Sequence, residues 1–346
     1  DFQSNGFQII ASGSDFADGN TSSANYIYMA FAGGLDTIAP VNTDGSITSR
    51  VKASDDTGFS IVQYEGIGSA GTIGHGLSSA PDWVLVKNRS TNVHSPAWPS
   101  WHTSLTDGGY YIDLATTAAQ ADGGTAVWND TAPTTSVFSV GTTSSCNTNG
   151  DEYIAYCWKA TAGKSAFGSY TGTGSSGKAI TGLGFRPAWI MIKGYDQTRN
   201  WVIVDNKRGG SVGHLHPNST ATEQTGDDEV QFDSDGFTLL SGDADSNYSS
   251  FNYIYMAFAD GQDASFFHDE SGQRNNFKPE HIHTVDVVPD NSTNNFATLN
   301  PLANNQSATL SEGNLKLVTP TSGYGVRFST IQIPTSGKWY WEAQLE

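Results

Sequence analysis

The stretch Asn25-Tyr-Ile-Tyr-Met-Ala-Phe-Ala32 returns as Asn252-Tyr-Ile-Tyr-Met-Ala-Phe-Ala259, and a looser copy, Glu152-Tyr-Ile-Ala-Tyr-Cys-Trp-Lys159, lies between them. All three copies are rich in aromatic and β-branched residues, lack Pro and Gly, and are bounded by polar segments rich in Asn, Ser and Gly. This pattern predicts a central β-strand. Successive side chains of a strand point to opposite faces. Because both faces are apolar here, we expect each copy at the centre of a covered β core.

Other motifs repeat around this stretch. Tyr64-x-Gly66-x-Gly68 returns as Tyr170-x-Gly172-x-Gly174. The apolar run Trp83–Lys87 returns as Trp189–Lys193, and each run begins two residues after a Pro. Internal repetition of this length indicates a chain of similar structural units. The repeat also aligns Trp101 of one unit with Trp201 of the next, and both are expected in the core.

The repeats divide the chain into five parts. Residues 1–34 form the second half of a unit, residues 51–161 and 162–261 form two complete units, residues 262–290 form a polar linker, and residues 291–346 begin another domain. Since the chain begins inside one repeat and ends inside a strand-like segment, we expect it to be part of a longer polypeptide.

Composition favours an all-β protein. The 346 residues include 38 Gly and 12% aromatic residues, and few stretches have helical periodicity. A unit of this size needs two packed sheets to bury its apolar faces, so we expect antiparallel, jelly-roll-like β-sandwiches. The net charge of −18 disfavours nucleic acid as a partner, because phosphates would be repelled. No run of about 18 apolar residues is present, so membrane insertion is not expected.

The two cysteines, Cys146 and Cys157, do not form a CxxC pair. Cys157 stands where the other copies have Ala30 and Ala257, which predicts a small buried thiol. A disulfide between the two cysteines is the alternative.

The order of these motifs resembles a known tandem repeat. Tyr-x-Gly-x-Gly, Pro-x-Trp-x-x-x-Lys, Val-Phe-Ser and Tyr-Ile-Ala-Tyr-Cys-Trp follow one another as in tail-fibre and appendage proteins of marine tailed bacteriophages, over residues 1 to about 261. That resemblance implies a structural repeat without catalysis. The end of the chain, residues 336–346, resembles the first strand of a SPRY domain, a concanavalin-like β-sandwich.

Aromatic residues suggest a ligand surface in the first complete unit. Trp98 stands between Pro residues in an insertion, a context that suits stacking on a sugar ring. The candidate ligand-binding residues are Trp98, His102, Tyr110, Tyr111 and Trp128. Packing within the domain or against another subunit is the alternative for all five.

Acidic loops at equivalent places in two repeats suggest calcium. Asp15 and Asp18 precede the first copy of the central strand, and Asp243 and Asp245 precede the last copy. Carboxylate oxygens are the ligands that Ca²⁺ prefers, although the EF-hand spacing is not met. The alternative is that these residues cap turns.

No enzyme class is indicated. No Gly-x-Ser-x-Gly motif lies between a strand and a helix. His281 and His283 share one face of an expected strand, but the sequence shows no third metal ligand beside them.

These observations predict a non-enzymatic structural protein of a virion, in an extracellular tail fibre or appendage whose units stack end to end as spacers. The expected partners are further copies of the chain in a homotrimer, other virion proteins, and a glycan or protein on the host surface. Two alternatives remain: a secreted or cell-surface bacterial adhesin or lectin, and a polysaccharide-degrading enzyme.

Overall fold

The computed structural model describes residues 39–90, 97–208, 213–224 and 230–259, together with residues 2–3, 6–9 and 30 and four short strands between residues 299 and 329. In these residues nearly all regular structure is antiparallel β-sheet, which confirms the all-β prediction. The helices described are two single turns, α1 (Gly124–Val127) and α2 (Ser144–Asn147). No helix in the described ranges is long and apolar enough to cross a membrane.

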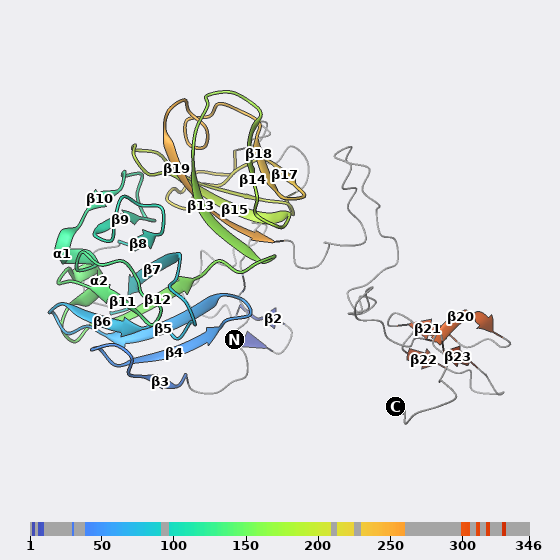
Figure 1. Ribbon diagram of the computed structural model, residues 1–346, viewed down its shortest axis with the longest axis horizontal. Helices are drawn as coiled ribbons and strands as arrows, with labels where there is room; N and C mark the ends of the chain where they lie inside the picture. The colour runs from blue at the N-terminus through green and yellow to red at the C-terminus, as the bar shows by residue number, and fades with distance from the viewer. Residues whose placement is uncertain are drawn as a thin grey trace.

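Unit 1, residues 39–161, contains one large sheet and one small sheet (Figure 1). The large sheet has the order β10-β9-β8-β7-β12-β5-β4-β3. Its strands are β3 (Val41–Asn42), β4 (Ser49–Ser54), β5 (Phe59–Glu65), β7 (Trp83–Asn88), β8 (Pro99–His102), β9 (Tyr110–Asp113), β10 (Ala121–Asp122) and β12 (Glu152–Trp158). The small sheet pairs β6 (Gly71–Gly74) with β11 (Val137–Val140). Strand β3 lies before residue 51 and β4 begins before it, so this unit starts earlier than the expected residue 51.

Unit 2, residues 162–259, repeats this plan with fewer strands. Its four-stranded sheet has the order β13-β19-β15-β16, from β13 (Ser165–Thr171), β15 (Pro187–Gly194), β16 (Trp201–Asp205) and β19 (Asn252–Ala259). Its three-stranded sheet joins β14 (Lys178–Thr181), β17 (Val230–Asp233) and β18 (Gly236–Leu239). The repeated central stretch thus forms β12 in unit 1 and β19 in unit 2, each between two neighbouring strands.

Six short strands lie outside the two units. They form the pairs β1 (Phe2–Gln3) with β2 (Gly6–Phe7), β20 (Leu299–Asn304) with β23 (Arg327–Ser329), and β21 (Thr309–Ser311) with β22 (Lys316–Val318). The copy of the central stretch at residues 25–32 lies outside the described residues except for Ala30, and so do residues 336–346.

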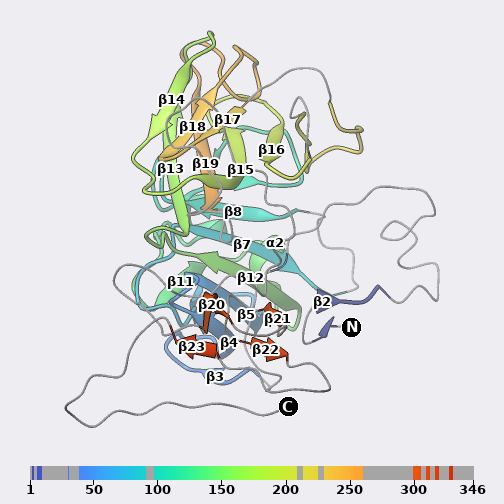
Figure 2. The same ribbon diagram turned by 90° about the vertical axis from the view of Figure 1, so that its right-hand side faces the viewer.

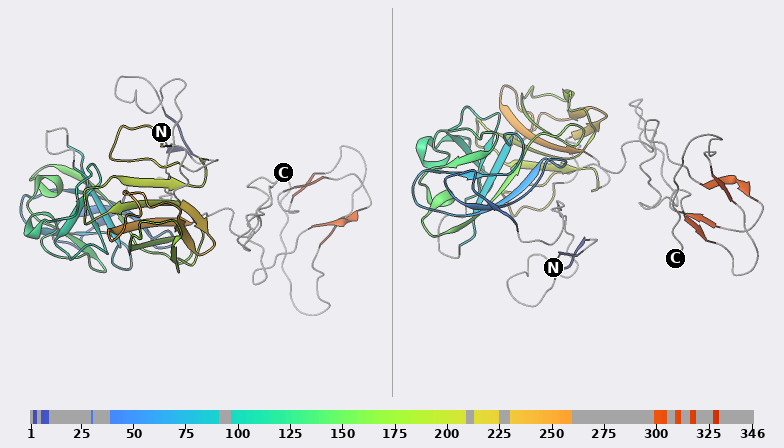
Figure 3. Two further views of the ribbon diagram at one scale, coloured as in Figure 1. Left: turned by 90° about the horizontal axis from the view of Figure 1, so that it is seen from above. Right: turned by 60° about the horizontal axis from the view of Figure 1, so that its bottom comes forward.

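The apolar cores order the four sheets of the two units as four layers, with the small sheets outside and the large sheets facing each other. Figure 2 shows the sheets of unit 2 above those of unit 1. Three apolar cores fill the spaces between layers. The inter-unit core joins unit 1 residues Phe59, Trp83, Leu85, Leu105, Ile112 and Trp158 to unit 2 residues Met191, Trp201, Ile203, Ile254 and Met256. Both views in Figure 3 show the two units in contact along one side. The end-to-end stacking expected from the sequence is therefore wrong for this pair, whose units pack face to face.

The predicted covering of both faces of the central strand is confirmed. In β19, Tyr253, Tyr255 and Ala257 lie in the core of unit 2, whereas Ile254 and Met256 lie in the inter-unit core. The second face needs a cover because it is apolar, and the neighbouring unit supplies that cover.

Candidate functional site: the interface between the two units

The repeated tyrosines occupy the same surroundings in both units. Tyr64 stacks on Tyr153 with ring centroids 5.2 Å apart, and Tyr170 stacks on Tyr253 at the same 5.2 Å. The Tyr153 hydroxyl donates to Ser144 O at 2.7 Å. The Tyr253 hydroxyl makes the equivalent bond to Ala244 O at 2.9 Å, and burial raises its pKa to about 12. This agreement confirms that the two segments are copies of one fold.

A buried asparagine that the sequence analysis missed supports each tyrosine pair. Asn147 Oδ1 accepts from Ile67 N at 2.8 Å, and Asn247 Oδ1 accepts from Thr173 N at 2.9 Å. The two amide groups then donate to equivalent carbonyls, those of Ser69 and Gly141 in unit 1 and those of Ser175 and Ser241 in unit 2. Both side chains are fully buried, so every bond replaces one lost to water. The sequence does contain a signal for these residues, because an Asn stands six residues before the first Tyr of each central stretch: Asn20, Asn147 and Asn247.

An arm of unit 1 reaches over to unit 2. It follows β9 and spans residues 114–120. Arg199 N donates to Thr117 O at 2.8 Å, and Gln120 N donates to Tyr195 O at 2.7 Å. The indole of Trp201, which has no exposed surface, donates to Asp113 O at 3.1 Å. Asp113 and the arm lie between Tyr111 and Trp128, two of the candidate ligand residues, and contribute polar contacts between the units.

A buried lysine completes this interface. Lys193 has no exposed surface, and its ammonium donates to Thr117 O at 3.0 Å and to Arg199 O at 2.6 Å. Burial lowers its pKa to about 8, an effect that the nearby Asp245 partly opposes. Its equivalent in unit 1, Lys87, is only half-buried and lies over the Trp98 ring at 5.7 Å. The same sequence position thus holds an interface contact in one unit and a surface contact in the other.

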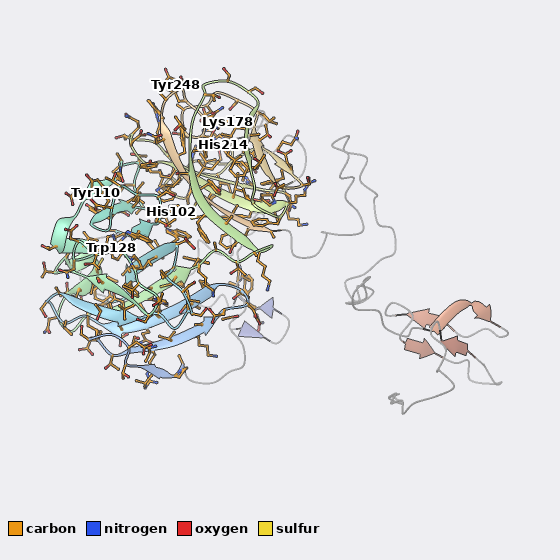
Figure 4. The ribbon with its side chains drawn as sticks, in the orientation of Figure 1. His102, Tyr110, Trp128, Lys178, His214 and Tyr248 are labelled. Atoms are coloured by element: carbon orange, nitrogen blue, oxygen red, sulfur yellow. The ribbon has the colours of Figure 1, made fainter. Side chains whose placement is uncertain are left out.

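The residues proposed as a ligand surface do not form one. His102 and Trp128 are buried, with 0% and 2% exposure, so neither presents a face to a sugar ring. His102 Nδ1 accepts from Ser104 N, and its Nε2–H donates to Tyr255 O of unit 2 at 3.2 Å. Figure 4 shows His102 in the part of unit 1 that lies next to unit 2. Burial lowers the pKa of His102 to about 4, so this contact uses the neutral imidazole. The proposed ligand role of both residues is corrected to a packing role.

The other three aromatic residues are half-buried. Trp98 and Tyr110 pack against the inter-unit core, whereas Tyr111 packs against the core of unit 1. The neighbours Tyr110 and Tyr111 point to opposite sides of the sheet because they are consecutive in β9. Trp98, Tyr110, Tyr111 and Trp128 are therefore divided between two cores, whereas His102 is a buried polar residue.

The alignment of Trp101 with Trp201 is wrong. Trp101 pairs with Val84, whereas Trp201 pairs with Lys193, the equivalent of Lys87. Continuing the antiparallel register of β8 by three residues places Trp98 across from Lys87. Trp98 is therefore the structural counterpart of Trp201. The insertion obscured this because it changes the spacing between the two strands in sequence.

The acidic loop of unit 2 makes turn contacts. Asp243 Oδ1 accepts from Asp245 N at 2.7 Å, and Asp245 accepts from the backbone and side-chain nitrogens of Asn200. Asp15, Asp18 and the His281/His283 pair lie outside the described residues. In the part of the chain that the structure describes, no group of three His, Cys, Asp or Glu side chains forms a metal-ligand set.

The buried thiols are separate. Cys146 and Cys157 are free and fully buried, which excludes the alternative disulfide. Burial raises the pKa of the Cys146 thiol to about 12 and raises the pKa of Cys157 as well. A thiol with a raised pKa is a poor nucleophile at neutral pH.

A histidine pair that the sequence did not single out lies beside β16. His214 and His216 are buried, with Nε2 atoms 3.2 Å apart, and His216 Nδ1 lies 2.8 Å from Trp201 O. The Nδ1–H of His216 therefore donates to the carbonyl, and its Nε2 accepts. Like His75, whose ring bonds Leu77 N and Thr134 O, this pair holds strands together.

Stacked antiparallel sheets with a shared interface place the chain among tandem β-sandwich proteins. The chain belongs to a family described as a domain of unknown function (DUF7483), whose profile matches residues 1–261. That match covers both described units and the N-terminal half-unit. No curated protein and no solved structure matches the chain.

Proposed function

We propose that the chain is a structural segment of an extracellular fibre or appendage of a tailed phage, in which pairs of units act as rigid spacers. The observation that carries this proposal is the inter-unit core, supported by the arm from residues 114–120. Two units that share a core cannot bend at the connection between them without exposing apolar surface. Rigidity over two units suits a spacer, which keeps the two ends of a fibre at a fixed distance.

Three further features support this proposal. The polar side chains at the interface bond backbone carbonyls: Lys193 donates to Thr117 O and His102 donates to Tyr255 O, so their chemistry is structural. The charge of −18 suits a solvent-exposed particle component. The motif order resembles phage appendage repeats, and the end of the chain resembles the start of a SPRY domain. On that resemblance we expect three identical chains in a fibre, joined to other virion proteins.

The experiment is to detect the protein in purified particles. Peptides of residues 39–259 should appear by mass spectrometry in particles purified by density, and gold-labelled antibodies to these units should decorate an appendage. Recovery of the protein only from a bacterial envelope fraction would contradict the proposal and favour an adhesin.

Glycan recognition is a second candidate function, favoured by one surface. The exposed carboxylates of Asp107, Asp122 and Asp130 surround Gly109: a Cβ atom there would lie 2.6 Å from Asp130 Oδ1 and 3.4 Å from Oδ1 of both others. Exposed carboxylates that lie close together can accept hydrogen bonds from sugar hydroxyls.

A glycan array with the chain and its Asp130→Asn variant tests this second function. Binding that the variant loses supports it, and no binding by either protein contradicts it. A reducing-end assay on bound polysaccharide separates binding from hydrolysis.

A further inference from the structure

The outer edge of β13 has no strand beside it among the described residues, although the same edge is covered in unit 1. Strand β5, the equivalent of β13, lies between β12 and β4. Strand β4 arises from residues 39–58, the part of unit 1 that precedes β5, whereas β13 follows β12 directly through residues 159–164. Unit 2 therefore has no segment of its own in the place that β4 fills.

The backbone groups that face this edge can be identified. Gly172 N donates to Phe251 O, and Ala259 N donates to Lys164 O, both at 2.8 Å. In an antiparallel pair the bonded residues alternate, so the even-numbered residues of β13 bond β19. The odd-numbered residues Phe167, Ser169 and Thr171 therefore direct their N–H and C=O groups outward. Ser165 is also odd-numbered, but its backbone groups are already bonded to Thr161.

The edge also lacks the features that usually prevent pairing. Natural edge strands are kept apart by charged residues, Pro, bulges or short length. Strand β13 (Ser165–Thr171) reads SAFGSYT, which contains no charge and no Pro, and its pairing with β19 is continuous. At the other end of the same sheet, Ile203 of β16 is bonded on both backbone groups to Leu215. In unit 1 the large sheet ends in two-residue strands, β3 and β10.

We propose that β13 pairs with β13 of a second copy of the chain, antiparallel, about a two-fold axis through Ser169. Two copies with a charge of −18 each repel, so contact is favoured where a surface carries no charge. In this register Ser169 faces Ser169 of the second copy, and Phe167 faces Thr171, an aromatic residue against a β-branched one. No like charges meet, and the exposed N–H and C=O groups of both strands become bonded.

This inference goes beyond the proposed function and is tested separately from it. Two-fold pairing gives an even number of copies, whereas the fibre expectation is three. Native mass spectrometry and light scattering on the full chain should show a concentration-dependent dimer. Hydrogen exchange should show protection of the Phe167, Ser169 and Thr171 amides that is lost on dilution.

Variants at Ser169 decide the register. Ser169→Pro removes an outward N–H without touching a bond to β19, so the dimer dissociation constant should rise about tenfold or more. Ser169→Ala is the matched control and should stay dimeric. Ser169→Lys and Ser169→Asp should each be monomeric alone because like charges meet at the axis, and mixing them should restore a heterodimer.

Three results would overturn the proposal. They are a wild-type chain that stays monomeric at its highest soluble concentration, an assembly that Ser169→Pro leaves intact, and a charge-swapped mixture that does not pair. Thermal unfolding of each variant shows that unit 2 is still folded, which separates loss of pairing from loss of structure.

Discussion

Replacement of Trp201 by Ala should destabilise both units, although the residue belongs to unit 2. Trp201 has no exposed surface, packs in the inter-unit core and donates its indole N–H to Asp113 O of unit 1. Trp-to-Ala changes in a core cost about 3–5 kcal/mol. The lost hydrogen bond accounts for about 1 kcal/mol of that cost. The free energy of unfolding should fall by this amount.

Urea unfolding followed by hydrogen exchange is the assay, because it reports each strand separately. We expect loss of amide protection in β9 of unit 1 as well as in β16 of unit 2. Trp101→Ala is the matched control, since Trp101 lies in the core of unit 1. Trp201→Phe keeps much of the apolar contact and should cost less. If Trp201→Ala loosens unit 2 while β9 keeps its full protection, the inter-unit core does not couple the units.

Three other predictions concern single residues. Asn247→Ala leaves Thr173 N without its partner in a buried site, so the free energy of unfolding should fall by about 2–4 kcal/mol, measured as a shift of the urea midpoint; an unchanged midpoint would show that the amide is dispensable. Gly172→Ala places a Cβ atom 2.2 Å from a backbone oxygen and should lower the melting temperature, whereas no change would mean that the loop can move aside. Lys193 has a folded-state pKa of about 8, below its usual 10.5, so the unfolded state holds the proton more tightly. The free energy of unfolding should therefore rise between about pH 8 and 10, by up to about 3 kcal/mol. Lys193→Met should abolish this rise in pH-dependent urea unfolding, and Lys87→Met should keep it.

Much of the fold was predictable because the copies of the repeated stretch can be aligned residue by residue. Tyr153 and Tyr253 are identical residues in identical strand positions, and the alternation of large apolar residues on both faces showed that both faces are covered. The sequence did not show what covers the second face. That depends on how two sheets meet in space, which strand periodicity does not encode.

The site was harder to predict because aromatic residues on an insertion have two uses. Pro-flanked Trp98 looked like a stacking platform, but strand pairing places it opposite Lys87 and against the inter-unit core. The buried amides Asn147 and Asn247 were missed since polar residues in a loop usually face solvent. Their constant spacing from the following Tyr was the available signal.

The shared core is tested most directly by calorimetry of the two units. We predict a single transition for residues 39–259, with equal calorimetric and van't Hoff enthalpies, because neither unit can unfold without exposing the inter-unit core. Two separate transitions, with Trp201→Ala shifting only one of them, would contradict the account.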